Sequence, residues 1–334
     1  MQRKPDMTPF YRRILTDAWR IAWHHKHLWV FGFFATLIGF GAVTEVFFNS
    51  YERTADALPL AASSGTLSAL IPGLTTIKAI VSYSPYPALS LLIFFVVLSL
   101  LFAVFAWMTL VAVGALVIGA RKISRGGEPT FGDGVKAGAD KFWRLLGVNL
   151  LSKIVILLAY VMTGANLYIL MKDRTVMSGL FYIGSFIIFT AVSFVASLGA
   201  VYGSINVAVK DEPLEKAVNS ALDLIAEHWL VSLEMAVLLL IASLATGVAA
   251  ALGTLVLSVP LIFLIVIAAV FKAQAAVYAI MTLTAVMLLV IVVCLGAFLT
   301  TFQSSAWTLL WSELAERKPS SKILRLAHHW RLHM

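Results

Sequence analysis

The chain has 334 residues, of which 60% are hydrophobic and 13% charged, and its formal net charge is +8. Soluble globular chains are about 45–50% apolar and about 25% charged, so this composition excludes an ordinary soluble enzyme and a disordered tail. The single cysteine, Cys294, excludes an intramolecular disulfide framework. A polytopic helical membrane protein is therefore expected, with residues 1–334 forming a single transmembrane domain.

Six apolar runs are long enough to cross a hydrocarbon layer about 30 Å thick, which takes about 20 helical residues. In chain order the predicted spans lie within Leu28–Phe48, Ala88–Ala120, Val148–Met171, Gly179–Val209, Leu230–Leu255 and Ala275–Trp311. The second of these runs is longer than a span needs, which predicts tilting or projection beyond the bilayer.

One further apolar stretch, Val256–Phe271, contains Pro260 and is short for a full span. It is either a seventh helix or a re-entrant or interfacial element on the outer side. Six spans with both termini inside place 19 Lys and Arg residues on inner segments and 5 on outer ones, whereas seven spans give 15 and 9. The positive-inside rule therefore favours six spans, with both termini cytoplasmic in a plasma or inner membrane.

Most tryptophans fall near the predicted cytoplasmic boundary, where an indole ring is half-buried and its N–H stays wet. The expected interface anchors are Trp19, Trp23, Trp29, Trp143, Trp229, Trp307 and Trp311. Basic residues at the same boundary predict contact with anionic lipid headgroups, and nucleic acid is not expected as a partner.

Three similar stretches each precede an apolar span, which predicts an internal repeat. Residues 8–29, 128–143 and 212–229 each open with a proline motif and end in Trp. In the second and third stretches the apolar side chains recur at spacings of three and four, which predicts amphipathic helices in the interface plane. In the second, Thr130 and Asp133 resemble a capping box. The alternative is that these are ordinary helices of cytosolic loops.

The expected fold is all-α, with six transmembrane helices in three hairpin repeats, each preceded by an amphipathic interfacial helix. The repeat units are roughly 7–120, 129–210 and 212–312, and residues 313–334 form a cytoplasmic amphipathic tail.

Two segments carry a family resemblance. Residues 12–29, which include Arg12-Arg13-Ile14 and His27-Leu28-Trp29, and residues 302–311, which begin Phe302-Gln303-Ser304, are similar to sequences in a broad superfamily. It comprises uncharacterised six-span membrane domains that resemble the membrane region of glycerophosphodiester phosphodiesterases. The resemblance implies a six-span architecture. In that family the phosphodiesterase chemistry belongs to a separate soluble domain, so no catalytic residues are carried over.

Polar side chains inside spans are costly and are therefore candidates for function. Lys153 and Glu234 have opposite charge and similar predicted depth, and we expect them to approach each other near the inner leaflet; simple anchoring of Lys153 at the interface is the alternative. Asn149 occupies a repeat position similar to that of Glu234. Glu45 lies near the outer end of the first span, where it is either interfacial or lines a path.

Other residue patterns predict packing rather than chemistry. Gly199 and Gly203 form a small-xxx-small pattern that allows close helix packing within the chain or, alternatively, across a dimer. Histidine pairs at helical spacing, such as His24 and His27, lack further ligands, so no metal and no cofactor are expected.

No catalytic motif is recognisable in the sequence, and a non-enzymatic protein is expected. The favoured function is a membrane scaffold or lipid-associated protein, with a second copy or another membrane protein as a further expected partner. The alternative is a transporter for an apolar or amphipathic solute, supported by the repeat and by a broken helix at Pro260.

Overall fold

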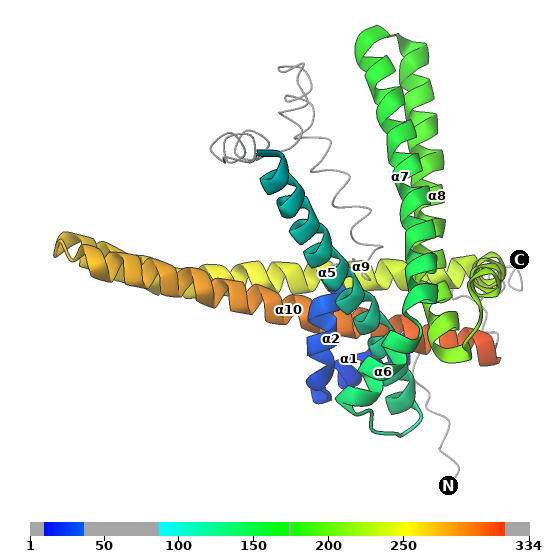
Figure 1. Ribbon diagram of the computed structural model, residues 1–334, viewed down its shortest axis with the longest axis horizontal. Helices are drawn as coiled ribbons and strands as arrows, with labels where there is room; N and C mark the ends of the chain where they lie inside the picture. Colours follow the sequence, from blue (N-terminus) through cyan, green and yellow to red (C-terminus); the bar gives the residue numbers. More distant parts are fainter. Residues whose placement is uncertain (1–9, 37–86, 174, 318–334) are drawn as a thin grey trace, which may run out of the picture. The chain divides into compact units, whose positions relative to one another are not determined.

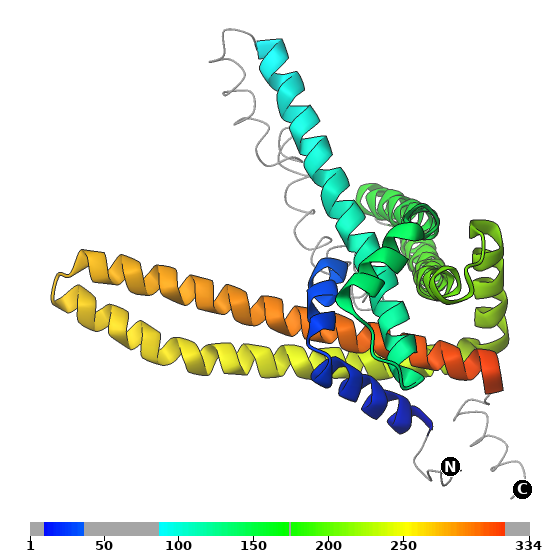
Figure 2. The same ribbon diagram turned by 60° about the horizontal axis from the view of Figure 1, so that its bottom comes forward.

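The computed structural model describes residues 10–36, 87–173 and 175–317, and its regular elements in these ranges are all α-helices (Figures 1 and 2). They are α1 (Phe10–His24), α2 (His27–Thr36), α5 (Pro87–Ser124), α6 (Phe131–Asp140), α7 (Phe142–Asp173), α8 (Val176–Lys210), α9 (Leu214–Val270) and α10 (Gln274–Arg317). The all-helical prediction is confirmed for this part of the chain.

Five of these helices, α5 and α7 to α10, are long and apolar enough to cross a membrane. They run from 32 residues in α7 to 57 in α9, whereas a hydrocarbon layer takes about 20 residues. The length and apolar composition of these helices thus indicate a multi-pass membrane protein. The first predicted span, Leu28–Phe48, begins as α2, and its remainder lies outside the described residues.

The stretch Val256–Phe271 forms the last part of α9, which neither of the predicted alternatives described. Residues 256–270 are neither a separate span nor a re-entrant element, because they continue α9 without a break. Pro260 lies inside the helix, where it removes one backbone hydrogen bond; apolar spans tolerate this because neighbouring groups compensate. The helix ends in a tight turn at Lys272, whose φ of 53° allows the chain to reverse into α10.

Two pairs of helices form antiparallel hairpins. Helices α7 and α8 lie side by side, as do α9 and α10, in both views (Figures 1 and 2). Helix α8 begins with a capping box in which Thr175 and Ser178 satisfy each other's backbone N–H groups.

Three helix breaks occur just before tryptophans. The first, at His25 and Lys26, separates α1 from α2, and the second, at Lys141, separates α6 from α7. The third is at His228 inside α9, where φ is −128° and ψ is 31°. In each case an amphipathic segment precedes an apolar one, which is short in α2 and long in α7 and α9.

The chain divides into two compact units, residues 1–43 with 109–334 and residues 44–108. The described part of the second unit is the exposed, apolar first half of α5. The core of the first unit is formed by α1, α2, the end of α5, α8, α9 and α10. Its largest fully buried side chains include Trp307, Tyr202 and Leu28.

Candidate functional site: the junction of the helix ends

Most buried polar side chains of the first unit gather where the helix ends meet, a region that we call the junction. It comprises residues 10–36, 109–149, 197–239 and 297–317. The buried polar side chains of this region are Thr109, Asn149, Ser197, Ser204, Asn206, Glu212, His228, Ser232, Thr300, Thr301, Gln303, Ser304, Ser305, Thr308 and Ser312. Buried polar groups are costly unless they are hydrogen-bonded, so the partners of these side chains decide what the junction does.

Helices α8, α9 and α10 are joined by a chain of buried hydrogen bonds through Asn206. The indole N–H of Trp311 donates to Asn206 Oδ1 at 3.0 Å, and Asn206 Nδ2 donates to the carbonyl of Ala217 at 3.2 Å. The cations of Arg121 and Lys210 lie 5.8 and 5.3 Å from the centroid of the Trp311 ring. Trp311 therefore uses its N–H, its ring face and its apolar edge in contacts within the protein.

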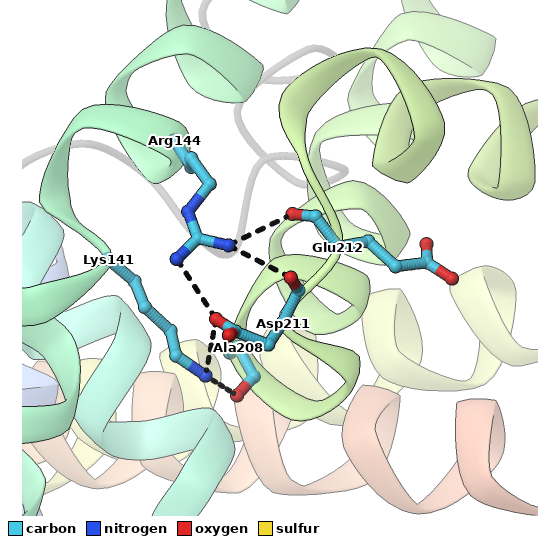
Figure 3. Close-up of polar contacts among 5 residues, drawn as sticks. All are labelled: Lys141, Arg144, Ala208, Asp211 and Glu212. Atoms are coloured by element: carbon cyan, nitrogen blue, oxygen red, sulfur yellow. Dashed lines mark hydrogen bonds and ion pairs between the residues drawn. The ribbon is translucent and has the colours of Figure 1, made fainter.

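A second cluster joins the start of α7 to the turn between α8 and α9 (Figure 3). Lys141 Nζ donates to the carbonyl of Ala208 at 2.7 Å and lies 3.5 Å from Asp211 Oδ1. Arg144 lies 3.0 Å from Asp211 Oδ1 and donates to the carbonyls of Asp211 and Glu212 at 2.9 and 3.4 Å. Cations at the carboxyl end of α8 complement its dipole and satisfy its last carbonyls.

Asp211 makes this turn possible through its backbone as well as its charge. Its φ of 59° and ψ of 28° place it in the left-handed region, which Asp and Asn tolerate better than most residues. The three residues from Asp211 to Pro213 thus end α8 and start α9.

Helix α1 is fastened to α9 and α10 by two polar contacts. Arg13 pairs with Glu313 at 2.6 Å, and the hydroxyl of Tyr11 donates to Glu234. Glu234, expected to approach Lys153, thus has an observed partner on α1. Lys153 is exposed on α7, and its pairing with Glu234 stays a prediction.

Of the two remaining candidate polar residues, Asn149 and Glu45, the structure describes only Asn149. Asn149 is buried and donates to the carbonyl of Leu145 at 2.9 Å and to Ser204 Oγ at 3.2 Å, which ties α7 to α8. Glu45 lies outside the described residues.

The expected interface anchors fall into two groups. Trp19, Trp23, Trp143 and Trp229 are exposed, and Trp29 is half-buried with its indole N–H bonded to the carbonyl of Ala22 at 2.7 Å.

Trp307 and Trp311 differ from the expectation, because they are only 2% and 3% exposed and therefore do not face headgroups. The ring of Trp307 packs edge-on against Tyr202, with ring centroids 5.8 Å apart. Both indoles fill the space between helices and form part of the core.

The glycines show where helices approach most closely. A Cβ added at Gly203 would lie 2.9 Å from Val148 Cγ1, whereas one added at Gly199 would meet nothing within 4 Å. Gly32 and Gly138 are closer contacts that the sequence analysis missed. An added Cβ would overlap the backbone carbonyl oxygen of Ala297 in the first case and that of Val111 in the second. The Gly134-x-x-x-Gly138 spacing was the available signal for α6.

Two titratable groups outside the long spans have shifted pKa values. Hydrogen bonds from Thr130 and Lys122 lower the pKa of the exposed Asp133 carboxyl. Thr130 occupies the N-cap position of α6, but its hydroxyl accepts no backbone N–H and instead donates to Asp133 Oδ2 at 2.7 Å, so the expected capping box is incomplete there. Burial, and secondly the nearby His25, lower the pKa of His27.

Among the described residues, no cluster of three or more His, Cys, Asp or Glu side chains could hold a metal ion. The comparisons give no relative either: no family model, curated protein or solved structure matches the chain. The resemblance of residues 12–29 and 302–311 to six-span membrane domains stays a prediction.

Proposed function

We propose that the protein is a non-enzymatic membrane scaffold that associates with anionic lipids, and that the junction holds its spans together. The observation that carries this proposal is that buried polar side chains of the junction bond to neighbouring helices. Asn206, Asn149 and Tyr202 hydrogen-bond to groups on neighbouring helices, and the cations of Lys141 and Arg144 contact the end of α8. Groups used in this way stabilise helix packing, as polar side chains do between membrane helices.

The proposed architecture has six spans in three units. Five are the long helices, and the sixth is the predicted span Leu28–Phe48, of which the structure describes only the part in α2. The three breaks before Trp29, Trp143 and Trp229 support the repeat, since each separates an amphipathic segment from an apolar one. The excess of Lys and Arg on one side supports cytoplasmic termini.

A transporter is less well supported than a scaffold. Its two arguments were the internal repeat, which a scaffold has equally, and a helix broken at Pro260, but α9 is continuous through that residue. Discontinuous helices supply the free backbone groups that bind substrates in many transporters. The repeat alone does not favour a transporter over a scaffold, so we propose the scaffold.

Native mass spectrometry of the protein, extracted gently from its own membrane, tests the scaffold. The expected result is a defined multimer or a complex with another membrane protein, together with bound anionic phospholipid. A single soluble metabolite bound in stoichiometric amount, without a protein partner, would contradict the proposal and make its binding site the next target. Extraction in a harsher detergent is the control, because it should strip lipids from any membrane protein without regard to function.

A further inference from the structure

The two faces of α1 differ in what they contact. One face is buried in the core and consists of Tyr11, Ile14, Ala18, Ile21 and Ala22. The exposed residues of the helix are Arg12, Thr16, Trp19, Arg20, Trp23 and His24. A helix whose outer face carries charges cannot have that face in the hydrocarbon layer without a large desolvation cost.

Helix α1 lies against the second half of α10. Arg13 contacts Glu313 at one end of α1, and the rings of Trp19 and Trp23 lie with centroids 5.9 Å from those of Phe302 and Phe298 respectively. Residues 298–313 of α10 are therefore covered by a helix with a charged outer face. This part of α10 contains no charged residue before Glu313, but it is poorly placed to contact acyl chains.

The rest of the α9–α10 hairpin is different, and we call residues 240–296 its shaft. The α10 part, 274–296, has no charged and no buried residue. The α9 part, 240–270, has no charged residue, and Ala268 alone is buried. At 1.5 Å per residue these parts are about 35 and 46 Å long, whereas the hydrocarbon layer is about 30 Å thick and the bilayer with both headgroup layers about 40–45 Å. Tilting of the longer part accommodates its extra length. Lys272 marks the far end of the shaft.

An aromatic and basic patch lies where the shaft meets the junction. Trp19 and Trp23 stack with centroids 6.2 Å apart and planes 6° apart, yet they stay 49% and 53% exposed. Both rings meet the edge of Phe298, two residues from the shaft. Arg20, His24 and Lys26 are exposed beside them.

We propose that the hydrocarbon layer surrounds only the shaft of this hairpin and that the patch of Trp19, Trp23, Arg20 and Lys26 binds anionic phospholipid headgroups at its basic side. The parts of α9 and α10 that belong to the junction then lie beyond the hydrocarbon, as extensions of these two spans. Indoles prefer the headgroup level, and each cation near an anionic surface adds about 1 kcal/mol of attraction. This inference rests on the lipid association proposed above. It adds the depth at which the α9–α10 hairpin lies in the bilayer and the surface that binds the headgroups.

Two similarly exposed leucines of α9 distinguish this placement from a span at Leu230–Leu255. Leu233 (37% exposed) lies in the junction, and Leu257 (43% exposed) lies in the shaft. In a Cys294→Ser background, L233C should react with a membrane-impermeant maleimide in opened membrane vesicles, and L257C should not. Both thiols must react after denaturation in detergent, which is the control for each. Reaction of L257C, or protection of L233C, overturns the placement.

The headgroup surface has its own test. In native mass spectrometry of protein reconstituted with phosphatidylcholine and phosphatidylglycerol, the variant R20Q/K26Q should lose most of its retained phosphatidylglycerol. K136Q/K216Q, which removes two cations at exposed lysines of α6 and α9, is the matched control and should retain it. Equal retention by both variants overturns the lipid surface. The oligomer or partner complex is read in the same spectra, so failure of the scaffold proposal is seen separately.

Discussion

Replacing Gly138 by alanine is expected to push α6 away from α5, because the two helices meet backbone to backbone at this residue. An added Cβ would lie 3.0 Å from both the Cα and the carbonyl carbon of Val111, and closer still to its carbonyl oxygen. These are atoms of a helix backbone, so no rotation of a side chain relieves the overlap. Gly132, in the same helix, provides the matched control, since a Cβ added there meets nothing within 4 Å.

The size of the effect follows from the difference between the two variants. Alanine is favoured over glycine in a helix interior by about 1 kcal/mol, a gain that both substitutions share in large part. Overpacking costs about 1–3 kcal/mol and applies to G138A alone. The free energy of unfolding of G138A should therefore be about 1–3 kcal/mol below that of G132A. This corresponds to a melting midpoint lower by several degrees, at about 2–4 °C per kcal/mol.

The assay is thermal unfolding of the purified parent protein and both variants in the same detergent. The monodisperse fraction that remains after heating is measured by size-exclusion chromatography. A midpoint for G138A equal to or above that of G132A would refute the close contact between α6 and α5. A thiol-reactive dye is unsuitable, because the single cysteine, Cys294, is exposed in the native protein.

Three further predictions concern the junction. Trp311→Phe leaves the buried Asn206 Oδ1 without its indole donor, so thermal unfolding in detergent should show a loss of about 1–3 kcal/mol; an unchanged midpoint would contradict the bond. Arg13→Glu should destabilise the protein by placing like charges together, and adding Glu313→Arg should recover about 1 kcal/mol, measured by a double-mutant cycle. Burial lowers the pKa of His27 below its usual 6.5, so near this pH the unfolded chain binds more protons than the folded one. The free energy of unfolding should therefore fall as the pH drops through 6.5. His27→Gln should make this fall smaller, which unfolding midpoints measured across the pH range would show.

Hydropathy predicts where the long helices lie more reliably than where each one ends. The run from Leu230 to Phe271 was divided at Leu255 because a span needs only about 20 residues and Pro260 usually interrupts a helix. The structure keeps one helix because apolar residues continue on both sides of Pro260. Composition therefore predicted the apolar helix, but the length of a bilayer was a poor guide to the length of this one.

The partners of the junction were beyond the reach of the sequence. The Tyr11 and Glu234 side chains meet across 223 residues, and Trp311 and Asn206 across 105. A tryptophan between helices and a tryptophan at a headgroup surface both combine an apolar ring with a bonded N–H, so local sequence cannot separate them. Asn149 was singled out because polar residues in spans are costly, and that reasoning led to a residue that joins two helices.

The long separation between Arg13 and Glu313 has a consequence for biosynthesis. The two residues are 300 positions apart, so α1 leaves the ribosome well before α10 exists. At about 5–20 residues per second, the apolar face of α1 waits about 15–60 s for the helix against which it packs. During this interval lipid, the insertion machinery or a chaperone has to cover that face, so we expect the yield of the folded protein to depend on translation speed and on chaperone supply.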